Sequence, residues 1–359
     1  MAALPQATLD ARTGRVSHAI YDHHARTQED GRRPHLGASL IGRECRREAW
    51  YAFRWARRLR HEGRMLLLFQ TGHLAEPRFV ADLKALGATV LDRDVNGRQF
   101  GFSALGGHFG GSADAIATGL PYAPRTWACV EFKTHGSRSF ATLKSRGVKL
   151  AKPEHYAQLQ CYMLALQLDR ALYLAKNKDT DELHDEWLTL DRPFAESLRA
   201  KALAIIQADV PPPGTGTGPN DPTCRRCDYR ELCFGTAVPA PSCRSCAHAT
   251  PVTDRPSPDG LGGAWRCEKW EADIPTLQAQ RDGCTGHRYI PILLSKSADA
   301  IEYHDGDIHY RLHGSGARFA NGEGEGALSS EDIHRCPDKP GLAVAAQLKA
   351  RFPTASVIG

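Results

Sequence analysis

Two carboxylates and one lysine are spaced so that they could hold a divalent cation next to a phosphate. Asp114 follows a Gly-Gly-Ser-Ala run, and Glu131 and Lys133 lie two residues apart on a strand expected over 126–132. Because side chains alternate along a strand, Glu131 and Lys133 point to the same face. Mg²⁺ and Mn²⁺ prefer oxygen ligands, and such an ion can activate water and offset the charge of a phosphodiester. A surface Glu-Lys pair at an ordinary strand end would look the same, so the triplet needs support from its surroundings.

A helix upstream of that strand offers a further carboxylate. Glu76 lies one turn after Gly72 on a helix expected over 65–86, so the two residues share a face. His73 is the competing candidate for the same role. Pro77 lies inside this helix and predicts a kink or a break there.

A helix downstream of the strand carries two more polar side chains. Gln158 and Tyr162 share one face of the helix expected over 153–168. Before it, residues 134–152 are expected to form a basic loop. The stretch 133–153 contains six Lys or Arg and no acid, which suits a phosphate backbone next to a metal.

The remaining elements place these residues in a mixed α/β core. Strands are expected over 88–93, 99–105, 109–117, 171–175 and 185–190, a basic amphipathic helix within 38–64, and a last helix over 193–208. The order of strands and helices predicts a mixed sheet with helices. Aromatic residues within the basic helix could stack on bases or pack against the core; they are Trp50, Tyr51, Phe53 and Trp55.

This arrangement resembles the PD-(D/E)XK nuclease superfamily, and in particular its RecB-like branch, over roughly residues 38–235. The matching segments, in order, are GHLAE at 72–76, GSAD at 111–114, EFK at 131–133 and QLQCY at 158–162. The resemblance implies a restriction-endonuclease-like α/β fold, in which helices flank a mixed central sheet. It also implies a DNA substrate, presented as single strands or ends, and an exonuclease acting in recombination, repair or phage DNA metabolism.

The same resemblance assigns roles to single residues. It implies that Asp114, Glu131 and the carbonyl of Phe132 bind Mg²⁺ or Mn²⁺, and that Lys133 positions or deprotonates the attacking water. Glu76, with His73 as its competitor, fills a helix position at the metal that is His or Glu in relatives. Gln158 and Tyr162 lie near the DNA and the active site. Two alternatives are a DNA-binding or scaffolding protein without turnover and a CRISPR-associated spacer-processing nuclease.

A first set of cysteines closes this region. Cys224, Cys227 and Cys233 offer three thiolates within ten residues, and Cys45 is the candidate for a fourth ligand. One cysteine upstream and three downstream is the pattern of RecB-like nucleases with a [4Fe–4S] cluster, so the resemblance implies such a cluster as a structural staple. A zinc ion with the same four ligands is the alternative, and for Cys45 alone a merely buried thiol.

A second set of cysteines follows, to which the resemblance does not extend. Cys243, Cys246, Cys267 and Cys284 predict a tetrahedral Zn²⁺ site in a zinc-ribbon-like module, where His248 or His287 could replace one cysteine. The module could contact DNA or a protein partner, or could be a structural knob without any partner. Cys129 and Cys161 lie in apolar runs and are expected in the core.

Composition and length bound the remaining questions. The chain has 359 residues, a formal net charge of +5 and eleven cysteines. Because it has neither a long apolar run nor a secretory signal, we expect a cytoplasmic protein without a membrane span and with metal-binding rather than disulfide-bonded cysteines. The expected division is an irregular segment (1–36), the nuclease domain (37–236), the cysteine-rich module (237–293, after a linker at 211–222) and a weakly structured region (294–359).

Overall fold

A five-stranded mixed sheet forms the centre of the larger part of the molecule. The computed structural model describes residues 15–335. The strands lie in the order β2-β5-β6-β7-β8, and only the β6–β7 pair is parallel. Their bounds are β2 Thr89–Leu91, β5 Ala115–Thr118, β6 Ala128–His135, β7 Arg170–Asn177 and β8 Leu183–Thr189. The predicted mixed α/β fold is therefore confirmed.

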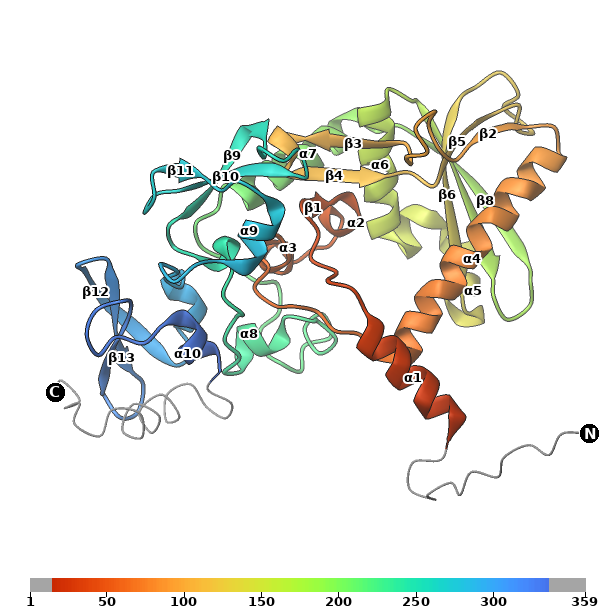
Figure 1. The fold of residues 1–359 in the computed structure, drawn as a ribbon. Helices are drawn as coiled ribbons and strands as arrows, with labels where there is room; N and C mark the ends of the chain where they lie inside the picture. Colours follow the sequence, from red (N-terminus) through yellow and green to blue (C-terminus); the bar gives the residue numbers. More distant parts are fainter. Residues whose placement is uncertain (1–14, 336–359) are drawn as a thin grey trace, which may run out of the picture.

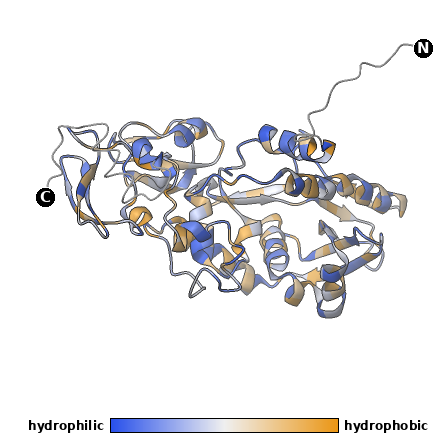
Figure 2. Ribbon diagram, turned by 90° about the horizontal axis from the view of Figure 1, so that it is seen from below, coloured by the Kyte–Doolittle hydropathy of each residue, from blue (hydrophilic) through white to orange (hydrophobic). Residues whose placement is uncertain are grey.

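Helices cover both faces of this sheet (Figure 1). On one face α4 packs against β2 and β6, and the ring of Phe79 stacks on that of Phe132 with centroids 5.0 Å apart. On the other face lie α5 and α6, with α7 packed against α6. The bounds are α1 Val16–Thr27, which packs on α4, then α4 Gly63–Ala85, α5 Ser137–Ala151, α6 Pro153–Leu166 and α7 Arg192–Ile206. Figure 2 shows hydrophilic and hydrophobic segments alternating along the helices, as expected when one side is packed.

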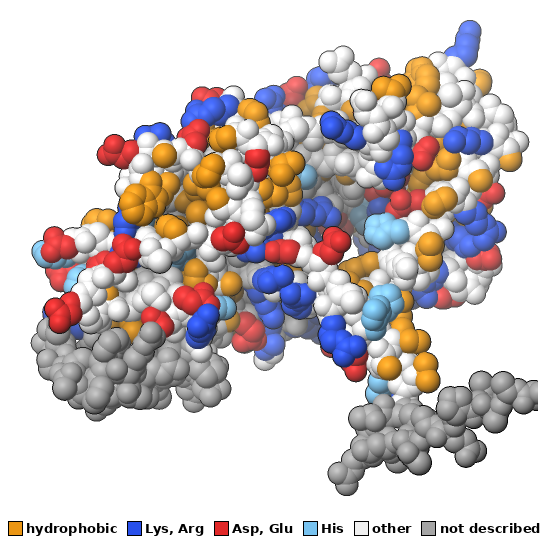
Figure 3. Space-filling view, viewed as in Figure 1, with side chains coloured by type: hydrophobic (Ala, Val, Ile, Leu, Met, Phe, Trp, Pro, Cys, Tyr) orange, Lys and Arg blue, Asp and Glu red, His pale blue; other side chains and the backbone are white. Residues whose placement is uncertain are grey.

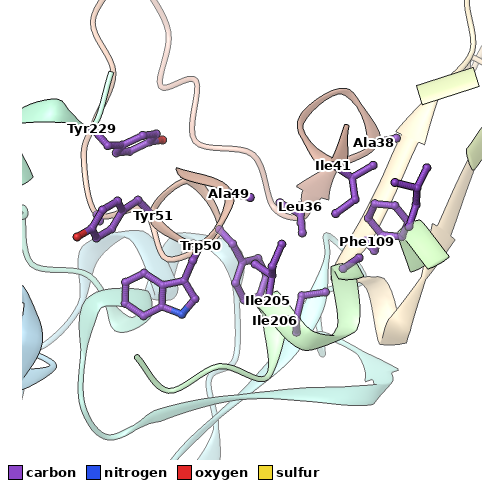
Figure 4. Close-up of a cluster of buried hydrophobic side chains, with 14 of the residues drawn as sticks. Leu36, Ala38, Ile41, Ala49, Trp50, Tyr51, Phe109, Ile205, Ile206 and Tyr229 are labelled. Atoms are coloured by element: carbon purple, nitrogen blue, oxygen red, sulfur yellow. The ribbon is translucent and has the colours of Figure 1, made fainter. Parts of the chain in front are cut away.

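A smaller sheet leads the chain into the central one. It has the order β1-β4-β3, with β1 (Leu36–Gly37), β3 (Gly101–Ala104) and β4 (Phe109–Ser112), and η1 (Leu105–Gly107) joins β3 to β4. The short helices α2 (Ala38–Ile41) and α3 (Arg46–Phe53) pack beside it. Figure 4 shows the apolar cluster that these elements build, with side chains such as Leu36, Ile41 and Phe109. All four aromatic residues of the expected basic helix are buried, so they pack in the core.

Several expected elements differ from the observed ones. The basic helix expected within 38–64 is shorter than predicted, because α3 ends at Phe53 and Trp55 just beyond it has a left-handed φ of 51°. The strand expected over 109–117 divides at Ala113 and Asp114. Pro77 does not break α4, which runs through it.

Two segments expected to be irregular are helical. The prediction of a basic loop over 134–152 is wrong, because Phe140 and Leu143 supply a buried face for α5, which kinks at Gly147 before the buried Val148. The expectation of an irregular segment over 1–36 is wrong for α1, which packs against α4. Close approach of these helices requires Gly63, since a Cβ there would lie 2.0 Å from the Tyr21 carbonyl oxygen.

The C-terminal part is more regular than expected. Two three-stranded antiparallel sheets occupy it, at the end of the molecule away from β2 and β8 (Figure 1). The sequence predicted irregular chain up to residue 293 and weak structure beyond it. Both predictions are wrong for the described residues, because the strands bury alternate side chains, such as those of Ile308, Tyr310 and Leu312. Residues 336–359, with Cys336, lie outside them. The elements are α8 Arg230–Phe234, η2 Cys243–Ser245, β9 Ala249–Pro256, β10 Gly263–Cys267, β11 Ala272–Asp273, α9 Leu277–Asp282, η3 Pro291–Leu294, β12 Ala298–His304, β13 Asp307–Leu312, β14 Arg318–Asn321 and α10 Ser330–His334.

The cysteine-rich segment shares its core with the preceding region. Trp265 of β10 stacks on Phe53 of α3 with ring centroids 5.3 Å apart. The fully buried guanidinium of Arg244 donates to the carbonyl oxygens of Pro34 (2.8 Å) and Phe53 (3.3 Å) and lies 3.8 Å from the centroid of the Trp55 ring. The segment is thus joined to the rest by a common core. Among residues 15–335, no helix is both long enough and apolar enough to cross a membrane.

Candidate active site

A cavity of about 1100 Å³ lies beside the middle of β6, and residues of α4, α6 and the end of β4 also line it. In Figure 3 the surface is hollowed between α4 and the β1–α2 segment, and Lys, Arg and His side chains gather around the hollow. All eight residues that the sequence places at the nuclease site line this one cavity: His73, Glu76, Asp114, Glu131, Phe132, Lys133, Gln158 and Tyr162. The fold thus brings together residues from four separate segments.

Glu131 is the most deeply buried charged residue of this set. Its side chain is 1% exposed on the inner stretch of β6, and its Oε2 atom has no hydrogen-bond partner. Burial raises the pKa of Glu131 to about 7, and the nearby Asp114 adds to the rise while Lys133 opposes it. A buried carboxylate oxygen without a partner is costly unless a cation faces it.

Lys133 lies on the same face of β6 as Glu131, as the strand alternation predicts. Its ammonium pairs with Glu131 Oε1 and donates to the carbonyl oxygen of Phe132 at 3.2 Å. Burial alone would lower the pKa of Lys133, but the carboxylates of Glu131 and Asp114 outweigh it and raise the pKa. Lys133 is therefore an ammonium at neutral pH in the metal-free protein.

Asp114 occupies the short link between β4 and β5, where the chain passes from the small sheet to the central one. Its Oδ2 atom accepts a hydrogen bond of 2.8 Å from the backbone N–H of Phe132, which holds the carboxylate beside the end of β6. Burial raises the pKa of Asp114, and Lys133 opposes the rise. The glycine run before it is needed for space, because a Cβ at Gly111 would lie 2.8 Å from Cε1 of Tyr162.

The flanking helices contribute the other predicted residues. On α6, the Gln158 amide donates to the Tyr162 hydroxyl at 2.8 Å, and both side chains are buried. On α4, His73 and Glu76 contact each other through Nδ1 and Oε1 at 3.1 Å. The His73 side chain is 76% exposed and that of Glu76 is 32% exposed, so Glu76 is the better placed of the two to reach a buried ion.

The sequence interpretation missed a buried chain of hydrogen bonds beside Lys133. The Tyr173 hydroxyl of β7 bonds to His135 Nε2 (2.9 Å) and to His155 Nδ1 (2.8 Å). Burial, together with the nearby charges of Lys133 and Lys152, lowers the pKa values of His135 and His155 to about 4 and about 3, so both rings are neutral at neutral pH. Two signals could have found them, since His135 lies two residues after Lys133 on one strand face and His155 one turn before Gln158.

Basic residues also surround the cavity. Arg33, Arg43, Lys84, Arg93 and Lys152 line it. They come from the segment before β1, from α2 and its turn, from α4, from the β2–β3 connection and from the α5–α6 link. Only Lys152 belongs to the basic stretch 133–153 that was expected near a phosphate backbone. The other four are scattered along the sequence, so no single basic run predicted them. A phosphate backbone bound here would meet cations on several sides.

The first set of cysteines converges on a separate cavity of about 240 Å³. Cys45, Cys224, Cys227 and Cys233 all line it, together with Tyr51 and Tyr229. The two tyrosine rings stack with centroids 5.7 Å apart (Figure 4). Gly216 also lines the cavity, and a Cβ added there would collide with Cys224 Sγ. The α3 start and the segment after α7 therefore meet at these thiols.

The second set converges on a much smaller cavity, of about 20 Å³. Cys243, Cys246, Cys267 and Cys284 line it with His248 and His287. Both ring nitrogens of His287 have hydrogen-bond partners, Ser245 at 3.1 Å and Ser330 at 2.7 Å. His248 Nε2 is buried without a partner, so His248 is the better candidate of the two to replace a thiolate. Cys129 and Cys161 are buried core residues, as predicted.

Metal-binding geometry is not preformed at any of these places. Over residues 15–335, no three His, Cys, Asp or Glu side chains stand together in an arrangement that could hold a metal ion. The ten cysteines in this range are all free thiols. The unpartnered Oε2 of Glu131 is nevertheless a feature that a cation would satisfy.

Comparison with known proteins identifies a family. A model of the PD-(D/E)XK nuclease superfamily matches residues 2–234. The solved structure of SSO0001 is 17% identical, covers 52% of this chain and 82% of its own, and has a TM-score of 0.29. The structure of the alkaline exonuclease LHK-Exo from Laribacter hongkongensis is 14% identical, covers 52% of this chain and 89% of its own, and has a TM-score of 0.34. The structure of LHK-Exo in complex with dAMP is also 14% identical, covers 49% of this chain and 88% of its own, and has a TM-score of 0.34. No curated protein matches the sequence significantly.

Proposed function

This chain belongs to the PD-(D/E)XK nuclease superfamily, and on that basis we propose that it is a metal-dependent DNA nuclease of the RecB-like branch. The observation that carries the proposal is the buried carboxylate of Glu131, whose Oε2 lacks a partner in the cavity that Asp114 and Lys133 also line. A carboxylate in that state calls for a cation. The family match ends at residue 234, next to the proposed domain boundary at 236.

The donor set fits Mg²⁺ or Mn²⁺, which are hard ions that prefer oxygen. Asp114, Glu131 and the carbonyl oxygen of Phe132 would hold the ion, and Glu76 would complete the set from α4. When bound, the ion supplies an acidified water and offsets negative charge on the phosphate. Glu131 Oε2 is a buried acceptor without a partner, which is unfavourable. An ion that binds this oxygen would remove that penalty, and this gain would strengthen ion binding.

The protein's own groups then bind and orient the substrate. Lys133 is an ammonium, so it can donate hydrogen bonds but cannot take a proton from the attacking water. We therefore assign it the role of holding a water or a phosphate oxygen in place. Gln158 donates to the oxygen of the Tyr162 hydroxyl, so the hydroxyl hydrogen is free to turn toward another acceptor, such as a phosphate oxygen. The neutral His155 beside them adds no charge that would compete with the ion.

We propose exonuclease action on DNA ends or single strands, in recombination, repair or phage DNA metabolism. The second candidate is a DNA-binding or scaffolding protein without turnover. Convergence of Asp114, Glu131 and Lys133 on one cavity supports turnover instead. The third candidate, a CRISPR-associated spacer-processing nuclease, would use the same residues, but its pattern lacks the C-terminal cysteine-rich segment.

End-labelled single-stranded and duplex DNA, incubated with Mg²⁺ or Mn²⁺, provides the test. We expect cleavage that chelation with EDTA abolishes, and losses of roughly a hundredfold or more in Lys133→Ala and Asp114→Ala. Lys144→Ala is the matched control, because Lys144 is an exposed lysine on α5 that lines neither the cavity nor its rim. Unchanged cleavage in both active-site variants would refute the assignment. Binding without any cleavage would favour the scaffolding function.

For the first set of cysteines we propose a [4Fe–4S] cluster that joins the two ends of the nuclease domain. Support comes from the shared cavity, which at about 240 Å³ is far larger than the one at the second set. Gly216 also leaves room over the Cys224 thiol. Protein purified without oxygen should contain about four iron atoms per chain, and Cys45→Ala should lose them. One zinc ion per chain at this place, with no iron, would support the alternative.

For the second set we propose one structural Zn²⁺ held by Cys243, Cys246, Cys267 and Cys284. The small size of their common cavity, about 20 Å³, supports a single ion. One zinc per chain that Cys267→Ala releases is the expected result. A protein partner at this segment, and a cytoplasmic location that keeps all these thiols reduced, remain predictions.

A further inference from the structure

A second cavity of about 720 Å³ adjoins the proposed active site. The two cavities share five lining residues, which are Arg33, His73, Glu76, Phe132 and Lys133. The active-site lysine therefore stands where the two spaces meet. Asp114 and Glu131 line only the first cavity, so the second cavity extends the site beyond Lys133.

One wall of the second cavity is aromatic and apolar. Phe69 and Leu68 of α4 line it and are 44% and 45% exposed. The His61 ring meets the Phe69 ring edge-on, with centroids 5.2 Å apart. Large apolar side chains left exposed beside an active site are a feature of ligand-binding surfaces. Phe69 thus offers an exposed aromatic ring within the lining of this cavity.

The opposite wall is polar and basic. It consists of the end of β6, Ser139 of α5 and Lys178 after β7. Over the whole cavity, Arg33, Lys133 and Lys178 face a single acid, Glu76. Lys178 also pairs with Asp179, but both side chains are at the surface, where such a pair contributes little. An aromatic wall facing a basic wall matches a nucleotide, which has a flat base and a charged phosphate.

We propose that this second cavity holds the nucleotide next to the scissile phosphate of a single DNA strand, with its base stacked on Phe69. The inference rests on the proposed nuclease function and names its substrate as single-stranded at this position. Bases in a duplex are stacked on each other, so a base reaches a protein ring only from an unpaired strand. Phe69 thus selects unpaired DNA at the site.

Binding measurements without turnover test the proposal. Fluorescence anisotropy in EDTA would compare a labelled single strand with a blunt hairpin of the same sequence. For Phe69→Ala we expect weaker single-strand binding by about 5- to 100-fold, the range for loss of one stacked base. Phe69→Trp should retain wild-type affinity. Leu74→Ala is the matched control, because Leu74 is 71% exposed on the same helix and lines neither cavity.

An abasic scan separates stacking from a general loss of structure. Removal of one base near the cut should weaken binding to the wild type and leave Phe69→Ala unaffected, which is the signature of direct coupling. Equal losses at every position in both proteins would overturn the proposal, as would tighter binding of the hairpin or of RNA than of single-stranded DNA. These results are independent of cleavage, so an inactive protein that shows the coupling would refute the nuclease function and leave the stacking site intact.

Discussion

Titration of Glu131 should make the metal-free protein less stable as the pH rises. The carboxyl has a pKa of about 7 in the folded protein against an ordinary value of 4.5. Below pH 4.5 both states are protonated. Between these values the unfolded chain ionises first, so the folded state loses stability, and above about pH 7 the loss is complete. At about 1.4 kcal/mol for each tenfold change in proton affinity, the loss is about 3 kcal/mol.

Replacement by glutamine isolates this effect. Glu131→Gln keeps a neutral side chain of similar shape at every pH, so the difference in stability between wild type and variant should fall by about 3 kcal/mol between pH 4.5 and 8. With the average unfolding entropy per residue, this corresponds to a relative shift in Tm of about 4 °C. Calorimetry in EDTA would measure it. Glu182→Gln, at a glutamate with a side chain 47% exposed, is the matched control.

Addition of the cation should reverse the loss. Mg²⁺ or Mn²⁺ at pH 8 should raise the Tm of the wild type and have little effect on Glu131→Gln, because the ion stabilises the ionised carboxylate. Parallel pH profiles for wild type and variant in EDTA would refute the reasoning on burial. Equal stabilisation of both proteins by the ion would show that it binds elsewhere.

Three further predictions concern other parts of the structure. Tyr173→Phe removes the hydroxyl that bonds to the buried His135 and the half-buried His155, so we expect a loss of about 1–3 kcal/mol by urea unfolding and reduced cleavage; unchanged stability together with unchanged cleavage would contradict a role for this network. Gly111→Ala places a Cβ 2.8 Å from Tyr162 and should lower cleavage while costing about 1–3 kcal/mol; full activity would show that Tyr162 moves freely. Arg244→Met removes the guanidinium that donates to Gln280, Phe53 and Pro34, leaves these acceptors without that donor, and should cost about 2–5 kcal/mol by urea unfolding, whereas a cost as small as that of Lys144→Ala would mean that the C-terminal segment is not anchored there.

Local patterns along the chain were sufficient for several parts of the active site. The common face of Glu131 and Lys133 follows from strand alternation, which is a local property of the backbone. The same is true of Gln158 and Tyr162 on one helix face. Burial of Cys129 and Cys161 was predicted from their apolar neighbours, and the mixed α/β class from the order of elements.

Helix α5 and the C-terminal sheets could not be predicted in this way. The segment 134–152 is basic and contains Gly147, so its composition favours a loop. Its helix forms because Phe140 and Leu143 are buried in the hydrophobic core that the sheet and helices share. Likewise, Trp265 and Arg244 join the cysteine-rich segment to Phe53, which is about two hundred residues away in sequence. Contacts over such separations leave no periodic signal in the chain.

The sequence by itself therefore determined which side chains could do the chemistry, since their types and spacing depend only on neighbouring residues. Tertiary structure alone decided that Glu76 of α4, Asp114 and the α6 pair reach the same cavity. It also decided that Glu131 is buried with one unpartnered oxygen and a pKa of about 7, and that Phe69 stands beside the site. Burial and proximity arise from packing between distant segments, and they determine the protonation state of Glu131 and which side chains line one cavity.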